Sequence, residues 1–373
     1  MVPIVRNEDR GFLISHDSEP FVDEGIIVTN GLNLLPWNEV FPKEPDQESN
    51  DSEQDIETEP KRKKLSKHDK REQKLQKKAN AARNKRLRRQ EQMDTSSSSS
   101  IPPRSQYNPY SSRIKIKELY SKIIALNKTT VSDKVKEQKN VDRKLFQYHL
   151  IAMYLSDLEL YLPGEWLNDN NILFAYELLN YSFLQDDSQA LKQIQLLYPS
   201  LVQLFLHYPD VDDLASMLPP EIKQAKFIFL PINFIDDYEG IDLEEINVGD
   251  HWALTVLDIL SGELLVYDSM VAESNESNTK LVRELILRLL KCESVFGNQL
   301  KHVQVKYMKC DQQTNFDDCG IYVAMITSML IYRLISTPVD QTISLDIGRV
   351  KFDPLSGRSM MLDLVYKVMQ SVN

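Results

Sequence analysis

Two features that mark other classes of protein are missing from this 373-residue sequence. Its first residues, MVPIVRNEDRGFL, carry charge where a secretory signal needs an apolar core, so we expect no such signal. No apolar run reaches the roughly 18 residues that suggest a membrane span. The longest run, residues 320–335, is interrupted by Arg333 and predicts a buried helix. We therefore expect a soluble protein with no membrane partner.

Cysteine is also scarce. The three residues, Cys292, Cys310 and Cys319, are odd in number and widely spaced, and no Cys-x-x-Cys pair occurs. This pattern argues against a disulfide framework and against a zinc site, and we expect neither a metal nor another cofactor. It fits a reducing compartment, where a free cysteine beside a histidine is a candidate nucleophile. We assign that chemistry to Cys319 and none to Cys292 or Cys310.

Residues 1–110 predict a mostly disordered arm with an acidic and then a basic segment. Acidic residues recur from Glu44 to Glu59 with almost no apolar partner, so this segment cannot bury enough surface to offset its ordering entropy. Residues 61–89 then hold fifteen Lys or Arg against two acids, a local charge of +13, before a Ser-rich linker. Residues 1–40 are more apolar and could dock on this protein or on a partner.

The charge balance bears on partners. The net charge of the whole chain is -11, so -24 remains outside the basic run. An acidic folded part argues against nucleic acid as its substrate and for a partner with a basic face. The basic run resembles a nuclear localisation signal and predicts nuclear and cytoplasmic location. It is equally compatible with a helical arm that binds RNA or DNA, or with a solvated tail. This run is the one part of the chain where we expect nucleic acid to bind.

Regular structure is predicted from about residue 111. Apolar residues at helical spacing between Ile114 and Ile124 indicate a helical connector within 111–143, and residues 144–373 have the pattern of a globular domain. The elements expected there are helices at 166–181, 281–290 and 320–334, and strands at 226–233, 251–259, 263–267 and 303–308. The pair Ser261-Gly262 predicts a hairpin turn. Interleaved helices and strands with a hairpin indicate an α+β fold with a mixed central sheet.

Three residue types suited to nucleophilic catalysis occur in this domain. His251 opens one strand of the hairpin and Asp268 follows the other, so the two can face each other at one edge of the sheet. The carboxylate would then fix the imidazole and stabilise its charged form. Cys319 precedes an apolar helix, whose N-terminal N–H groups favour a thiolate. The pattern predicts Cys319 as nucleophile, His251 as base and Asp268 as the residue that orients the base.

Two neighbours of the cysteine extend this site. Gly320 leaves room for a substrate carbonyl, and the amide of Gln313 together with the helix N-terminus could donate to a developing oxyanion. In known cases one such donor stabilises the transition state by about 3 kcal/mol. Taken alone, a histidine at a strand start, an aspartate at a turn or a small buried cysteine has an ordinary structural explanation. The three in this order and setting are much harder to explain as core residues.

These residues resemble the sentrin/SUMO protease family of ubiquitin-like-protein-specific cysteine proteases. The family patterns HWxL, YDS, QxNxxDCG and WLND correspond to residues 251–254, 267–269, 313–320 and 166–169. The resemblance spans about residues 145–345. It implies a papain-like fold, circularly permuted so that the nucleophile comes last, with Cys319, His251 and Asp268 as the triad and Gln313 in the oxyanion hole.

The resemblance also implies a substrate. Trp166 and Trp252 would close a tunnel over a C-terminal Gly-Gly tail, with Asp169 and Gly320 beside it, because only glycines fit between two indoles. The run from Trp166 looks closest to the deneddylase branch, and the acidic loop 234–250 would attract a basic modifier surface. We expect a monomeric isopeptidase that acts on a Nedd-type modifier and its conjugates, and on its precursor.

Three alternatives stay open at this point. The long arm is more typical of SUMO proteases, so a SUMO-specific protease is the first. The others are a module that binds a modifier without cutting it, and an acyltransferase on the same fold.

Overall fold

A computed structural model describes residues 13–15, 27–41, 109–130, 142–185, 191–208, 213–234, 249–271, 276–297, 300–337 and 341–372. Contacts group residues 1–41 with residues 108–373 in one compact unit, which holds all of these ranges. The predicted acidic segment and the basic run lie outside the described residues, as do residues 235–248 of the acidic loop.

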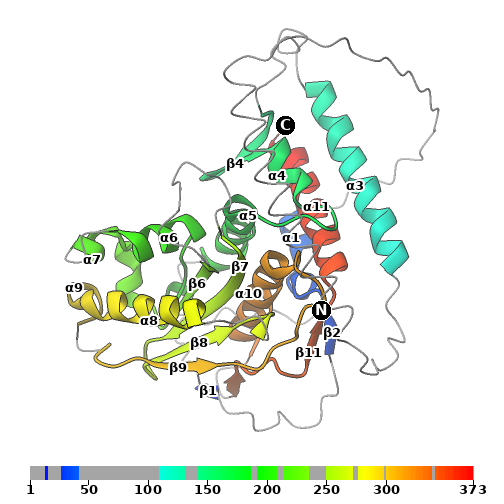
Figure 1. The fold of residues 1–373 in the computed structure, drawn as a ribbon. Helices are drawn as coiled ribbons and strands as arrows, with labels where there is room; N and C mark the ends of the chain where they lie inside the picture. The colour runs from blue at the N-terminus through cyan, green and yellow to red at the C-terminus, as the bar shows by residue number, and fades with distance from the viewer. Residues whose placement is uncertain are drawn as a thin grey trace, which may run out of the picture. The chain divides into compact units, whose positions relative to one another are not determined.

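A five-stranded mixed sheet lies at the centre of this unit, in the order β5-β6-β7-β8-β9 (Figure 1). Its strands are β5 (Ile194–Leu196), β6 (Phe227–Phe234), β7 (His251–Asp258), β8 (Glu263–Tyr267) and β9 (Gln304–Tyr307). The two outer pairs are parallel, and β6-β7 and β7-β8 are antiparallel. The predicted α+β class with a mixed sheet is confirmed, and the four predicted strands agree with β6 to β9 within a residue or so at each end.

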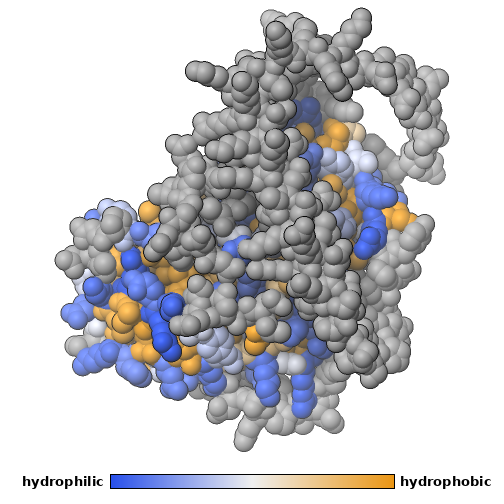
Figure 2. Space-filling model, viewed as in Figure 1, coloured by the Kyte–Doolittle hydropathy of each residue, from blue (hydrophilic) through white to orange (hydrophobic). Residues whose placement is uncertain are grey.

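Both faces of the sheet are covered, since successive side chains of a strand point to opposite sides. One cluster of apolar residues joins Phe229 and Leu254 to α5 (Asp169–Leu179), α10 (Cys319–Ser336) and α11 (Pro354–Val372). A second cluster joins Leu230 and Ala253 to the helices of the other face. Those helices are α6 (Pro199–His207), α7 (Leu214–Met217), α8 (Glu276–Lys291) and α9 (Glu293–Phe296). In Figure 2 the described surface in their region is a mixture of hydrophilic and hydrophobic residues.

Helix α10 is the core helix that the sequence predicted. Its length and composition would suit a membrane span, but 83% of it is buried within the protein. It packs across β7 on one side and against α5 and α11 on others. The residue at its first position, Cys319, is thereby held inside the unit and close to the start of β7.

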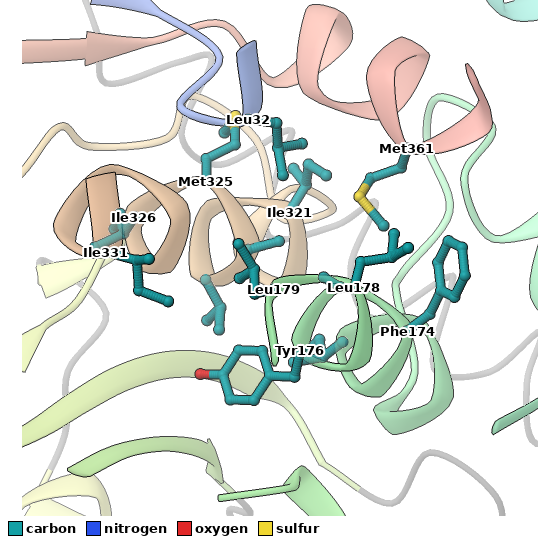
Figure 3. Packing of buried hydrophobic residues seen from close by; sticks show 14 of the residues in the cluster. Leu32, Phe174, Tyr176, Leu178, Leu179, Ile321, Met325, Ile326, Ile331 and Met361 are labelled. Carbon is teal, nitrogen blue, oxygen red and sulfur yellow. The ribbon is translucent and has the colours of Figure 1, made fainter. Parts of the chain in front are cut away.

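The described part of the N-terminal arm packs on this same helix. β1 (Leu13–Ser15) pairs in parallel with β10 (Thr342–Ser344), and β2 (Ile27–Thr29) with β11 (Val350–Phe352). The short helices η1 (Leu32–Leu34) and α1 (Trp37–Val40) follow. Leu32 is 1% exposed and lies close to Met325 of α10 (Figure 3). Gly31 has φ 70°, and a Cβ there would lie 2.3 Å from the carbonyl oxygen of Met325.

This arrangement differs from the arm predicted over residues 1–110. Residues 27–41 belong to the folded unit because their large apolar side chains, Leu32, Leu35, Trp37 and Phe41, are buried in its core. The option that residues 1–40 dock on this protein therefore holds for their described part. The predicted helical connector begins as α3 (Pro109–Thr130), which packs on α11 through Ile116, Leu119 and Ile123. The hairpin β3 (Lys144–Tyr148) and β4 (Ile151–Tyr154) and the short α4 (Leu155–Glu159) follow it.

Candidate active site

The β7-β8 hairpin brings His251 and Asp268 together as the sequence predicted. The imidazole Nε2 lies 2.7 Å from Asp268 Oδ1, and the two residues are 8% and 2% exposed. Asp268 Oδ1 also accepts from the backbone N–H of Met270 at 2.8 Å, which fixes the carboxylate. On the other side of β7, the ring of Phe234 stacks on the imidazole with centroids 5.9 Å apart. The imidazole is therefore held in one orientation from two sides.

The pKa of His251 reflects these contacts. Burial, the largest influence, lowers this pKa, but the hydrogen bond with Asp268 and the interaction with Cys319 outweigh it and raise the pKa to about 10. The second ring nitrogen, Nδ1, is buried and has no hydrogen-bond partner within the described part of the chain. Because Asp268 occupies Nε2, Nδ1 is the nitrogen that can exchange a proton with the thiol.

Cys319 is the first residue of α10 and is 1% exposed. A thiol at this position faces the unpaired N–H groups of the first helical turn, which favour negative charge. Its side chain interacts with the imidazole of His251, and this interaction contributes to the raised pKa of that histidine. The thiol, the imidazole and the carboxylate thus lie in one buried cluster, and these are the groups that acyl transfer by a thiol would use.

The loop before Cys319 is bonded to the segment that carries Asp268. The backbone carbonyl of Asp268 accepts from Gln312 Nε2 at 2.9 Å and from Cys310 Sγ at 3.1 Å. Gln313 accepts from Ser269 Oγ at 2.7 Å through Oε1 and donates to the carbonyl of Asn315 at 2.7 Å through Nε2. One of its two amide hydrogens is thus committed to the loop, which leaves one for a ligand.

Leu167, the residue after Trp166, contacts both Trp252 and the start of α10. Its carbonyl accepts from Trp252 Nε1 at 3.0 Å, and Trp252 itself is 3% exposed. A Cβ on Gly320 would lie 2.8 Å from Leu167 Cβ. The structure therefore gives Gly320 a packing reason, the close approach of α10 to Leu167, that differs from the substrate clearance we expected.

Trp166 and Asp169 flank this contact at the start of α5. Trp166 is half-buried, and Asp169 is exposed in the first helical turn. Asn168 caps α5, and its side-chain oxygen accepts a hydrogen bond from the N–H of Asn171 at 2.9 Å. All eight predicted site residues thus lie in α5, the β7-β8 hairpin, the 313–318 loop and the start of α10, or directly beside them.

The other two cysteines are protonated thiols at neutral pH. Burial raises the pKa of Cys292 to about 11 and that of Cys310 to about 12. Among the residues that the structure describes, no group of three or more His, Cys, Asp or Glu is placed to hold a metal ion.

Comparison with known proteins agrees with this geometry. Residues 165–347 match the Ulp1 protease family, C-terminal catalytic domain. This segment belongs to the Ulp1 protease family. It contains every predicted site residue, from Trp166 to Gly320, and Cys319 follows His251 and Asp268 along the chain. The predicted resemblance to the sentrin/SUMO protease family is thereby confirmed.

Relatives of the Ulp1-family segment are proteases named for ubiquitin-like modifiers. The chain is 31% identical over 220 residues to NEDD8-specific protease 2 of Schizosaccharomyces pombe, which covers 59% of this chain and 49% of that protein. It is 28% identical over 184 residues to NEDD8-specific protease 1 of the same organism, covering 49% and 40%. It is 27% identical over 191 residues to human sentrin-specific protease 8, covering 51% and 82%. The chain spans about half the length of the first of these relatives.

One buried residue that contacts this site was not predicted from the sequence. Arg358 of α11 donates to the carboxylate of Asp318, the residue before Cys319, and it lies beyond the Ulp1-family segment. A signal for it exists: Arg358 shares a helical stripe with Met361, Leu362 and Val365, all at most 1% exposed. An arginine on a buried apolar stripe indicates a buried partner.

Proposed function

We propose that this chain is a thiol protease that cleaves after the C-terminal Gly-Gly of a ubiquitin-like modifier, with a Nedd-type modifier as the preferred substrate. The observation that carries the proposal is the buried cluster of Cys319, His251 and Asp268 within the Ulp1-family segment. Two relatives that are named NEDD8-specific proteases support the choice of modifier.

The geometry suggests how the residues would act. The thiolate of Cys319 would attack the carbonyl carbon of the terminal glycine and form a thioester. The imidazolium of His251 would give its Nδ1 proton to the departing lysine amine. Water, deprotonated by the same nitrogen, would then release the modifier as a free acid and restore the thiol. Gln313 and the start of α10 are our candidates for binding the oxyanion.

Trp166, Trp252 and Asp169 are our candidates for binding the tail. Trp252 is fixed by its bond to Leu167, so its indole offers a rigid wall. The ends of the acidic loop meet at the site, since the N–H of Asp250 donates to the carbonyl of Phe234 at 2.7 Å and both adjoin His251. We propose that this loop attracts a basic face of the modifier.

A SUMO-specific protease is the second candidate function, because the four sequence blocks are shared across the sentrin/SUMO protease family. The test is a panel of Nedd, SUMO and ubiquitin probes, each with an electrophile in place of the terminal carboxylate. We expect Cys319 to capture the Nedd probe fastest. Fastest capture of the SUMO probe would instead favour the second candidate.

The cysteine variants test the chemistry itself. Cys319→Ala should abolish capture of every probe, whereas Cys292→Ala, a buried thiol on the far side of the sheet, should retain it. Continued capture by Cys319→Ala would refute the assignment. A wild-type protein that binds a modifier and neither reacts with the probe nor turns over would instead identify a binding module. Labelling by acetyl-CoA would identify an acyltransferase.

We also propose that the basic run directs the protein to the nucleus as well as the cytoplasm. A fluorescent fusion in which residues 61–64 and 85–89 are replaced by alanine should stay in the cytoplasm. Unchanged nuclear signal in that fusion would contradict the proposal.

A further inference from the structure

Arg358 is a buried charge whose N–H groups are all hydrogen-bonded. It lies in the second turn of α11 and is 0% exposed. A guanidinium has five N–H groups, and here each has an oxygen acceptor within 3.0 Å. The acceptors are Asp318 Oδ1 and the backbone carbonyls of Leu160, Leu162, Glu165 and Asp317.

These acceptors belong to two segments of the candidate active site. Asp317 and Asp318 directly precede Cys319, and Glu165 directly precedes Trp166. One rigid, planar group therefore fixes both the loop that carries the nucleophile and the segment that carries a candidate tunnel wall. A lysine cannot reproduce this, because it offers three donors from one point and no planar fork.

The same contact balances a charge beside the thiol. The Asp318 carboxylate is nearly buried, and its other oxygen accepts from Asn315 Nδ2 at 2.7 Å. An unpaired carboxylate next to Cys319 would oppose formation of a thiolate, as any like charge at short range does. Arg358 cancels that charge with a hydrogen bond of 2.9 Å.

We propose that Arg358 is a positioning residue for the reaction: it holds the nucleophile loop against the Trp166 segment and neutralises Asp318 so that Cys319 can ionise. This rests on the proposed function for the reaction itself, but the effect on Cys319 is independent of any modifier. If Arg358 positions Cys319, the residues that the reaction needs extend past residue 347, where the Ulp1-family segment ends.

The first test is the pH dependence of Cys319 alkylation by iodoacetamide, followed on the full chain by mass spectrometry. Arg358→Met leaves the Asp318 charge unpaired. The pH at which Cys319 alkylation reaches half its maximal rate, the alkylation midpoint, should therefore rise by about 1 to 3 units. Asp318→Asn leaves Arg358 unpaired and should move the midpoint the opposite way. Opposite directions are the decisive result, since a loosened fold would move both variants alike. Shifts in the same direction would overturn the proposal, and Asp318→Asn keeps the test usable if Arg358→Met does not fold.

The second test separates charge from position. Arg358→Lys keeps the positive charge and loses the fork, so its alkylation midpoint should match the wild type. Its kcat/KM on a modifier fusion should nevertheless fall by about 100-fold, the cost of misplacing reacting groups by about 1 Å. An unchanged kcat/KM would overturn the positioning role.

Arg288 provides a matched control. It donates to the Glu284 carboxylate and to the carbonyls of Phe205 and Tyr208, but on the opposite face of the sheet. Arg288→Lys and Arg288→Met should lower stability and leave the alkylation profile unchanged. If the wild type captures no modifier yet the alkylation shifts appear, the proposed function fails and the inference on Arg358 survives. If the wild type is active and the Arg358 variants behave like the Arg288 variants, the inference alone fails.

Discussion

Replacing Asp268 by Asn removes a buried charge beside His251 with little change of shape. An asparagine oxygen can accept from both His251 Nε2 and the N–H of Met270, as Asp268 Oδ1 does at 2.7 and 2.8 Å. The imidazole should keep its orientation and lose only the carboxylate charge. The variant therefore tests whether charge, and not merely placement, maintains the imidazolium.

The size of the effect follows from the pKa of His251, which is about 10 although burial alone would lower it. An opposite charge within hydrogen-bond distance raises such a pKa by about 1 to 3 units, so the pKa of His251 in Asp268→Asn should fall by about that much. Each unit corresponds to about 1.4 kcal/mol, so the imidazolium loses roughly 1 to 4 kcal/mol of stabilisation. If that imidazolium protonates the leaving amine, kcat/KM should fall by about 10- to 1,000-fold.

The assay is the pH dependence of kcat/KM on a modifier fusion, together with thermal unfolding at each pH. A raised pKa in the folded state stabilises the protein below the unfolded value of about 6.5, and this stability is lost as pH rises toward 10. In Asp268→Asn the alkaline limb of the rate and the loss of stability should both move to lower pH.

Asp311→Asn is the control for this prediction. Asp311 lies in the loop before Cys319 and is also nearly buried, but it bonds Lys351 and the N–H of Phe352 rather than His251. Asp311→Asn should be less stable than the wild type, but the alkaline limb of its kcat/KM profile should stay at the wild-type pH. An alkaline limb in Asp268→Asn that coincides with the wild type, at equal kcat/KM, would refute the argument that this charge holds the proton on His251.

Two further predictions concern packing. Gly320→Ala places a methyl group 2.8 Å from Leu167 Cβ, so the free energy of unfolding should fall by about 1 to 3 kcal/mol, measured by urea denaturation. If Gly320→Ala is as stable as the wild type, α10 can shift to accommodate the methyl group without loss of stability. Trp37→Ala removes a side chain that is 2% exposed and packs on Phe183, and should cost about 3 to 5 kcal/mol by the same assay. No loss would mean that residues 27–41 are not part of the stable unit.

The β7-β8 hairpin and helix α10 could be predicted because the sequence patterns that specify them are local. A strand, a Gly-containing turn and a second strand determine how His251 approaches Asp268, and an apolar run after Cys319 determines α10. The packing of residues 27–41 could not be predicted, because β2 pairs with β11 more than 300 residues away and short strands carry little periodicity of their own. Arg358 was not predicted, although it lies on an apolar helical stripe with Met361, Leu362 and Val365 that the sequence contains.

The pairing of residues far apart in the chain also determines when the candidate active site can be assembled. Asn30 donates to Ser356 across 326 residues, and the guanidinium of Arg358 reaches back 198 residues to Leu160. Contacts of such separation form slowly, since a long loop must close before they contribute. A nascent chain whose α11 is still within the ribosome therefore lacks the group that fixes the cysteine loop. Synthesis itself would delay completion of the candidate active site until nearly all of this unit has emerged.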